Sequence, residues 1–324
     1  MGEPIDAELL REFEAGLDPR RPELSRMPAR IIGYGEISTI FEIAHPALAG
    51  YAFKRMPLFR SVDEMSRYET LYEEYDRLIR ETIHIEVPES LTVRVLPERG
   101  NLIVYIAQRR LPSASIGNQL LHHLDDDAIG ILVSCLLKEM KRVWRFNGAG
   151  SGVRIGFDGQ ISNWALRGYD GSVKPRIGDD AAFYYFDTST PLMTRDGVEQ
   201  LDPELFLRSA PSFLVWLIRW LFLEDVMTRY YDFHLVAVDL IANFYKEQRP
   251  DLVGPLVDRV NDFFRNDAPE LAVAAVTEKE VRAYYREDAM IWRLYLALRR
   301  FDRFLHRAVL RKPYVYILPG RIKR

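Results

Sequence analysis

One long helical period stands between two groups of strand-like segments, and this order constrains the fold more than any other feature of the sequence. Residues 62–83 carry apolar side chains at helical spacing on one face: Met65, Tyr68, Leu71, Tyr72, Tyr75, Leu78 and Ile79. Patterns typical of strands precede it at 31–32, 38–43 and 51–56, and follow it at 91–96 and 102–107. A helix inserted into an antiparallel sheet indicates an α+β fold and excludes a parallel doubly wound one.

Beyond Arg110 the sequence becomes mainly helical. Helices are predicted at 116–124 and 125–146, a small group of strands within 153–186, and mostly helices over 202–306. We therefore predict four parts: a helix (6–16) and linker over 1–28, a sheet lobe over 29–110, a helical lobe over 111–306 and a basic tail over 307–324.

The overall charge balance argues against a protein that binds nucleic acid through bulk charge. The 324 residues carry 44 basic and 47 acidic side chains, a net charge of −3. This balance conceals a basic end, because residues 299–324 hold nine Lys or Arg and one acidic residue. A solvated tail is the commoner interpretation of such an end, and contact of Tyr314, Tyr316 and Ile317 with an anionic partner is the alternative.

The single cysteine and the lack of a long apolar segment indicate a cytoplasmic protein without a membrane span. Cys135 excludes an internal disulfide, and its apolar surroundings at 129–135 predict a buried, unreactive thiol. The N-terminus has neither the basic nor the apolar region of a secretory signal. The most apolar stretch, 213–223, has eleven residues with Arg219 among them, whereas a bilayer needs about 20.

Two motifs in the first lobe suit the binding of phosphate groups. Gly33, Gly35 and Ser38 form a Gly-x-Gly-x-x-Ser turn between two strands, where backbone N–H groups can approach phosphates. A strand rather than a helix follows, so this is not a dinucleotide-binding fingerprint, and alone the motif is commonly just a turn. Lys54 lies in the next strand and can reach phosphates if an acidic side chain holds it.

The long helix offers three glutamates as partners for Lys54, namely Glu69, Glu73 and Glu74. Glu74 stands four residues before Leu78 and therefore lies over the apolar face, so we prefer Glu74, with Glu73 next. The alternative for any one of these glutamates is a place on the solvated face of the helix.

Two motifs in the second lobe place carboxylates beside short strands. Asp158 and Asn163 stand five residues apart, a spacing in which the aspartate can accept a proton and the asparagine can coordinate a metal. The alternative is a β-hairpin with Asp158 and Gly159 at its tip. Asp187 ends the strand pattern at 183–186, where a carboxylate can hold Mg²⁺, and the alternative is a turn-forming aspartate.

Taken in this order, the motifs resemble the protein-kinase-like superfamily over roughly residues 29–191, and they are most similar to small-molecule kinases of the aminoglycoside phosphotransferase and choline kinase type. The resemblance implies a bilobal fold with ATP and Mg²⁺ in the cleft between the lobes. It implies these roles: a phosphate-covering loop at Gly33, Gly35 and Ser38, an ion pair of Lys54 with Glu74, a hinge beside adenine at 107–110 that includes Gln108, a catalytic base at Asp158, and metal ligands at Asn163 and Asp187.

The function implied is an ATP- and Mg²⁺-dependent phosphotransferase that acts on a small hydroxyl-bearing metabolite. The sequence also departs from the pattern, because Gly156 stands where the family has a histidine and Gln160 where it has a lysine. The 24 residues from Asn163 to Asp187 imply an extended loop at 169–180. The alternative function is a catalytically impaired pseudokinase that serves as a nucleotide-binding or scaffolding module, and a third is an α+β interaction protein.

Two other groups of polar residues favour structural roles. The six histidines show no metal-ligand spacing, since His122 and His123 are adjacent on a predicted helix and point apart. Around 216–231, charged side chains interrupt an apolar helix, and we expect structural ion pairs rather than the lining of a substrate cleft: Arg219, Glu224, Asp225, Arg229 and Asp232.

Overall fold

The computed structural model describes residues 5–35, 38–97, 102–208, 228–309, 311, 314 and 316–318. Its first half contains α1 (Ala7–Gly16), β1 (Ala29–Tyr34), β2 (Thr39–Ile43), β3 (Tyr51–Phe59), α2 (Val62–Arg77), β4 (Ser90–Val95) and β5 (Leu102–Arg109). The five strands form one antiparallel sheet in the order β1-β2-β3-β5-β4. A π-helical turn, Leu78–Thr82, extends α2 before the chain returns to the sheet.

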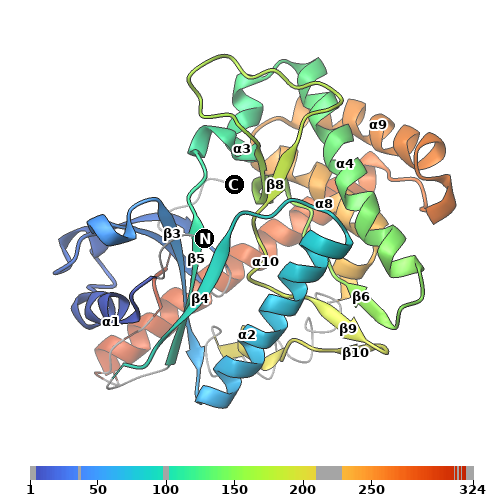
Figure 1. Ribbon diagram of the computed structural model, residues 1–324. Helices are drawn as coiled ribbons and strands as arrows, with labels where there is room; N and C mark the ends of the chain where they lie inside the picture. Colours follow the sequence, from blue (N-terminus) through green and yellow to red (C-terminus); the bar gives the residue numbers. More distant parts are fainter. Residues whose placement is uncertain are drawn as a thin grey trace.

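The second half is mainly helical (Figure 1). Its helices are α3 (Gly117–Leu120), α4 (Asp126–Gly148), α5 (Glu204–Arg208), α8 (Phe233–Lys246), α9 (Val253–Asn266) and α10 (Glu278–Phe304). Its short strands are β6 (Val153–Ile155), β7 (Trp164–Leu166), β8 (Phe183–Tyr185), β9 (Met193–Arg195) and β10 (Val198–Glu199). The predicted α+β fold, with an antiparallel sheet first and helices after it, is therefore confirmed.

The five-stranded sheet is covered on both faces, which explains the unbroken apolar run at 102–107. Successive side chains of a strand point to opposite faces. Val104 and Ile106 of β5 join the main core, which α2 shares with the helical half of the chain. Ile103 and Tyr105 join a second, outer core that contains Leu10, Phe13, Phe41 and Phe53. The sheet consequently lies between α1 and α2 (Figure 1).

Helix α1 is fastened to the sheet by a buried ion pair as well as by apolar contacts. The guanidinium of Arg55 donates from Nε to Glu14 Oε2 over 2.8 Å, and Tyr105 donates to the same oxygen over 2.6 Å. The side chains of Arg55 and Glu14 are 5% and 11% exposed. Because Arg55 points to the α1 side of β3, its neighbour Lys54 points to the α2 side, where the two halves of the chain meet.

The predicted solvated C-terminal end is wrong for its aromatic and apolar residues. Tyr314 and Ile317 are buried, and Ile317 packs into the outer core beside α1. The ring of Tyr316 lies under the guanidinium of Arg299, and its hydroxyl donates to the carbonyl oxygen of Arg208 over 2.7 Å. Positive charge indicated a tail in water, but the apolar side chains between the charges cover the apolar surface of the sheet.

Cys135 is a free, buried thiol whose pKa is raised by burial, as the sequence predicts. Within the described ranges, no helix has the length and hydropathy needed to cross a membrane. The apolar stretch 213–223 lies outside the described residues, as do Arg219, Glu224 and Asp225. The hairpin of β9 and β10 was not predicted from the sequence.

Candidate functional site

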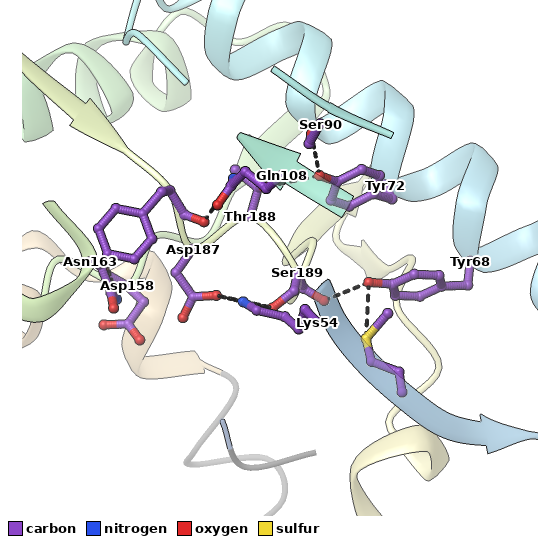
Figure 2. Close-up of polar contacts among 12 residues, drawn as sticks. Lys54, Tyr68, Tyr72, Ser90, Gln108, Asp158, Asn163, Asp187, Thr188 and Ser189 are labelled. Carbon is purple, nitrogen blue, oxygen red and sulfur yellow. Dashed lines mark hydrogen bonds and ion pairs between the residues drawn. The ribbon is translucent and has the colours of Figure 1, made fainter. Parts of the chain in front are cut away.

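Lys54 and Asp187 meet although 133 residues separate them in the chain. The Nζ atom of Lys54 lies 2.7 Å from Oδ1 of Asp187 and 2.7 Å from Oγ of Ser189. Ser189 Oγ in turn donates to Asp187 Oδ1 over 3.0 Å, so the three side chains form a closed triangle (Figure 2). β3 supplies the lysine, and the segment that leaves β8 supplies the other two.

The electrostatics of this triangle keep Asp187 ionised. Burial by itself raises the pKa of a carboxyl group, but the charge and hydrogen bond of Lys54, together with the hydrogen bonds of Ser189, outweigh burial and lower the pKa of Asp187. The Lys54 side chain is 15% exposed and that of Asp187 is 31% exposed. A negative charge is therefore held at the edge of the site, where a ligand can still reach it.

The predicted pair of Lys54 with Glu74 is wrong. Glu74 accepts a hydrogen bond of 2.7 Å from Arg195 of β9, and Glu69 accepts one of 2.6 Å from Nε of Arg94 in β4. The position of Glu74 on α2 faces the β9–β10 hairpin, and that hairpin delivers an arginine to it. Glu73 is exposed.

Asp158 and Asn163 lie on a loop that joins two different sheets, so the hairpin interpretation is wrong. β6, before the loop, pairs with β9, whereas β7, after it, pairs with β8. Within the loop, Asn163 Nδ2 donates to the carbonyl oxygen of Asp158 over 3.2 Å, and Asp158 Oδ1 accepts from the backbone N–H of Gln160 over 3.2 Å. A turn of 3₁₀ helix, Ile161–Asn163, then leads into β7.

Close packing beneath the loop explains the glycine that follows Asp158. A Cβ added at Gly159 would lie 2.6 Å from Sδ of Met140 in α4 and 2.7 Å from Cγ1 of Val236 in α8. The loop therefore rests directly on two helices of the second half, which hold Asp158 and Asn163 against the core.

In Figure 2, Asp158 and Asn163 lie on one side of Asp187 and Lys54 lies on the other. The electrostatics agree with this placement. Burial raises the pKa of Tyr75, and the charges of Asp187 and Asp158 raise that pKa further. The structure thus brings together four of the residues singled out from the sequence: Lys54 within β3, Asp187 just after β8, and Asp158 and Asn163 from one loop.

Gln108 lies near this group at the end of β5. Its Nε2 atom donates to the carbonyl oxygen of Phe186 over 3.2 Å, next to Asp187 (Figure 2). Gln108 therefore connects the end of β5 with the segment that carries Asp187. Its assignment to a hinge beside adenine remains a prediction.

The glycine turn connects β1 and β2, as the sequence predicts. The N–H of Gly35 donates to the carbonyl oxygen of Ser38 over 3.1 Å, and the residues between them, 36 and 37, lie outside the described part of the chain. Ser38 is buried and lines a small pocket with Arg55, Arg299 and Tyr316. The turn is thus placed beside the C-terminal segment, and its contact with phosphate remains a prediction.

Gly156 stands two residues before Asp158, where the kinase-like pattern has a histidine, and the space beside it is filled. A Cβ at this position would lie 2.8 Å from Cβ of Leu192 and 3.0 Å from Cζ of Tyr231. The backbone of Gly156 donates to the carbonyl oxygen of Leu192 over 2.9 Å. The loop is therefore anchored by its backbone and by neighbouring aromatic rings.

The side chains of Arg229 and Asp232, the two members of the charged group around 216–231 that the structure describes, interact with residues outside that group. Asp232 caps α8, accepting from the backbone N–H of His234 over 2.8 Å. Arg229 stacks over the rings of Tyr230 and Tyr284 and interacts electrostatically with buried Asp239.

The donor atoms present suit Mg²⁺. Mg²⁺ prefers oxygen ligands, keeps several waters and is usually held by one or two carboxylates together with substrate phosphates. Asp187 offers a carboxylate, and Asn163, whose amide nitrogen is engaged, offers its amide oxygen. Among the residues that the structure describes, no three His, Cys, Asp or Glu side chains cluster as a metal site. The remaining ligands would come from water and a bound phosphate.

Sequence reasoning missed the hydroxyl groups around this site. Ser189 was part of a turn motif after Asp187, and Tyr68, Tyr72 and Tyr75 were assigned to the apolar face of α2. A signal existed, because a buried tyrosine needs a hydrogen-bond partner for its hydroxyl group. Three tyrosines on one helix face therefore predict polar partners on the opposing segment.

Comparison with known proteins identifies a family. Two solved structures are similar to this one, each at 12% identity and a TM-score of 0.34: the GDP complex of wild-type aminoglycoside 2'-phosphotransferase-IIIa and that of a point mutant of the enzyme. The matches cover 81% of this chain and 95% and 94% of those chains. No curated protein matches the chain. A family model described as "Family of unknown function (DUF6206)" matches residues 28–303, and the chain belongs to that family.

Proposed function

We propose that this protein is a phosphotransferase that uses ATP and Mg²⁺ to phosphorylate a hydroxyl group of a small metabolite. One observation carries the proposal: Lys54 and Asp187, from opposite halves of the chain, lie 2.7 Å apart, with Asp158 and Asn163 beside them. Such a set of one lysine, two carboxylates and one amide provides the charges that phosphoryl transfer requires.

Each residue has a chemical role in this proposal. Lys54 neutralises charge on the phosphates, and Asp187 and Asn163 hold the metal. Mg²⁺, when bound, neutralises the charge that develops on the phosphate oxygens. Asp158 accepts the proton of the acceptor hydroxyl. The oxygen of that hydroxyl forms a bond to the γ-phosphorus while the bond between the γ-phosphorus and the leaving nucleoside diphosphate breaks.

The supporting parts follow the same division. The turn with Gly33, Gly35 and Ser38 would cover the phosphates, and Gln108 would lie beside adenine. The sheet lobe at 29–110 and the helical lobe at 111–306 would then enclose the nucleotide between them. Glu74 has no role at the nucleotide, because Arg195 occupies its carboxylate.

A second candidate is a pseudokinase that binds nucleotide without turnover. Two observations favour it. Lys54 is paired with Asp187 rather than with a glutamate of α2, and the space for an orienting histidine at position 156 is filled by Leu192 and Tyr231. Both candidates bind nucleotide. They differ in whether a phosphoryl group is transferred, with Asp158 accepting the proton of the acceptor hydroxyl.

Nucleotide binding is tested by thermal unfolding with ATP, and in parallel with GTP, in the presence and absence of Mg²⁺. Ligand at 100 times its Kd stabilises a protein by about 2.7 kcal/mol. Lys54→Met and Asp187→Asn should abolish the rise in melting temperature, and Lys174→Met, on an exposed loop, should leave it intact. A wild-type melting temperature that neither nucleotide changes would refute both candidates.

Turnover separates the two candidates. Slow Mg²⁺-dependent ATP hydrolysis, with water in place of the acceptor, is expected of a phosphotransferase and should be lost in Asp158→Asn while nucleotide binding is retained. Nucleotide binding without hydrolysis assigns the protein to the pseudokinase class. Hydrolysis that is unchanged in Asp158→Asn removes Asp158 from the mechanism.

A further inference from the structure

Three tyrosines form a row along one face of α2. Tyr68, Tyr72 and Tyr75 are spaced by four and three residues, which aligns them on a helix, and each is at most 4% exposed. The rings of Tyr68 and Tyr72 stack with their centroids 6.3 Å apart. A buried ring of this kind contributes to the core, while its hydroxyl group requires a polar partner.

The hydroxyl groups of the row form hydrogen bonds with two segments, the one after Asp187 and the one before Asp158. Tyr68 donates to the carbonyl oxygen of Ser189 over 2.7 Å. Thr188 Oγ1 donates to the hydroxyl of Tyr72 over 3.3 Å, and that hydroxyl also shares a hydrogen bond of 2.7 Å with Ser90 (Figure 2).

Tyr75 completes the row by donating to the carbonyl oxygen of Gly156 over 3.0 Å, two residues before Asp158. The first two tyrosines thus hold the segment after Asp187, and the third holds the loop that carries Asp158.

Burial keeps these hydroxyl groups protonated. It raises the pKa of Tyr72 to about 12 and those of Tyr68 and Tyr75 well above the ordinary tyrosine value. All three hydroxyl groups therefore keep their protons throughout the physiological pH range, and those of Tyr68 and Tyr75 donate to backbone carbonyl oxygens.

The contacts of Ser189 connect the row with the charged residues. Its carbonyl oxygen is held by Tyr68, while its hydroxyl group contacts both Lys54 and Asp187. Two glutamates of α2 are engaged elsewhere, Glu69 with Arg94 and Glu74 with Arg195, and Glu73 is exposed. Consequently the connection between α2 and the site runs through hydroxyl groups rather than through a glutamate.

We propose that the tyrosine row of α2 positions Asp187 and its neighbours to receive a metal-bound nucleotide, with Tyr68 as the principal positioning residue. The inference rests on the proposed nucleotide-binding function. It assigns α2 a part in ligand binding although the helix contributes none of the groups expected to touch the ligand. A tyrosine that serves only the core would influence stability and leave metal-dependent affinity unchanged.

The test is isothermal titration calorimetry of Tyr68→Phe with ATP, with Mg²⁺ present and with Mg²⁺ removed. The phenyl ring keeps the packing and loses the hydrogen bond to Ser189, together with a weaker one of 3.5 Å to Sδ of Met56. Such a loss is typically equivalent to about a two- to tenfold change in binding constant. We expect the affinity for ATP with Mg²⁺ to fall by about this factor and the affinity without Mg²⁺ to stay unchanged. Tyr72→Phe should show the same selectivity.

The matched control is Tyr169→Phe, which removes a hydroxyl that also donates to a backbone carbonyl, that of Val173, over 3.1 Å in an exposed loop. It should bind as the wild type does.

The outcomes separate this inference from the proposed function. Wild-type protein that binds no nucleotide contradicts the proposed function. If the wild type binds nucleotide and Tyr68→Phe binds with equal affinity, the positioning role is overturned while nucleotide binding stands. The same holds if Tyr68→Phe loses the same affinity with and without Mg²⁺.

Discussion

Adding one methyl group at Gly156 should destabilise the protein, because the space beside this residue is already filled. The new Cβ would lie 2.8 Å from Leu192 Cβ and 3.0 Å from the Tyr231 ring, closer than carbon atoms approach without displacement. Overpacking of this kind costs about 1–3 kcal/mol, and the stiffer unfolded chain returns about 0.4–1 kcal/mol. We expect Gly156→Ala to lower the free energy of unfolding by about 1–2 kcal/mol.

The assay is thermal unfolding followed by calorimetry. With an unfolding entropy of roughly 2.1 cal/mol/K per residue over 324 residues, 1 kcal/mol corresponds to about 1.5 °C, so Gly156→Ala should melt about 2–3 °C lower. Gly148→Ala is the matched control, since no atom lies within 4 Å of a Cβ there at the end of α4. It should raise the melting temperature by about 1 °C.

A Gly156→Ala variant that melts at or above the wild-type temperature, while Gly148→Ala behaves as expected, would refute the packing argument. It would also show that position 156 has room for a Cβ atom. In the background of Leu192→Gly, which removes the Cβ that makes one of the two contacts, the cost of Gly156→Ala should be smaller.

Three further predictions concern charged groups away from and within the site. Glu14→Gln should lower the free energy of unfolding by about 3–5 kcal/mol, measured by urea denaturation, because Arg55 then remains buried with an incomplete partner; a loss below about 1 kcal/mol would contradict this. The pKa of Asp187 lies below its ordinary 3.8, so the stability that its charge contributes is present above that pH and is lost as the pH falls through the lower pKa of the folded protein. In Asp187→Asn, the free energy of unfolding should therefore depend less on pH in the acid range. Burial lowers the pKa of His234, but Glu280 outweighs burial and raises that pKa above its ordinary 6.5. The stability from this pair is therefore present below pH 6.5 and is lost as the pH rises through the pKa of the folded protein. His234→Gln should remove this pH dependence of the free energy of unfolding, and an unchanged dependence would argue against the pair.

The arrangement of the first lobe could be predicted because each of its elements has a local cause. The apolar face of residues 62–83 gives α2, and the run at 102–107 gives β5, which is buried on both sides. These patterns depend on periodicity within a few turns or residues, and a single sequence contains that information.

Partners across the chain could not be predicted in the same way. The choice of Glu74 was based on the face of the helix, which shows where a side chain points but not which side chain opposes it. Arg195, its actual partner, lies on β9, a three-residue strand without a distinctive pattern. Register and pairing between distant segments decide such contacts, and one sequence leaves them open.

The same reason explains the loop at Asp158. Asp-Gly between two short strand patterns is the usual sign of a hairpin, and local rules favour that interpretation. The strands on either side instead pair with β9 and β8, which follow later in the chain. Only long-range pairing turns a commonplace turn motif into a loop that presents Asp158 and Asn163 side by side.

The burial of Ile317 in the outer core has a consequence for the order in which the molecule is made. Leu10 and Phe13, in the first helix, share that core with a residue more than 300 positions later. During synthesis the sheet emerges early, yet its α1 face stays incomplete until residue 317 has left the ribosome. Completing this core requires contacts of very long range in the chain, and such contacts form slowly.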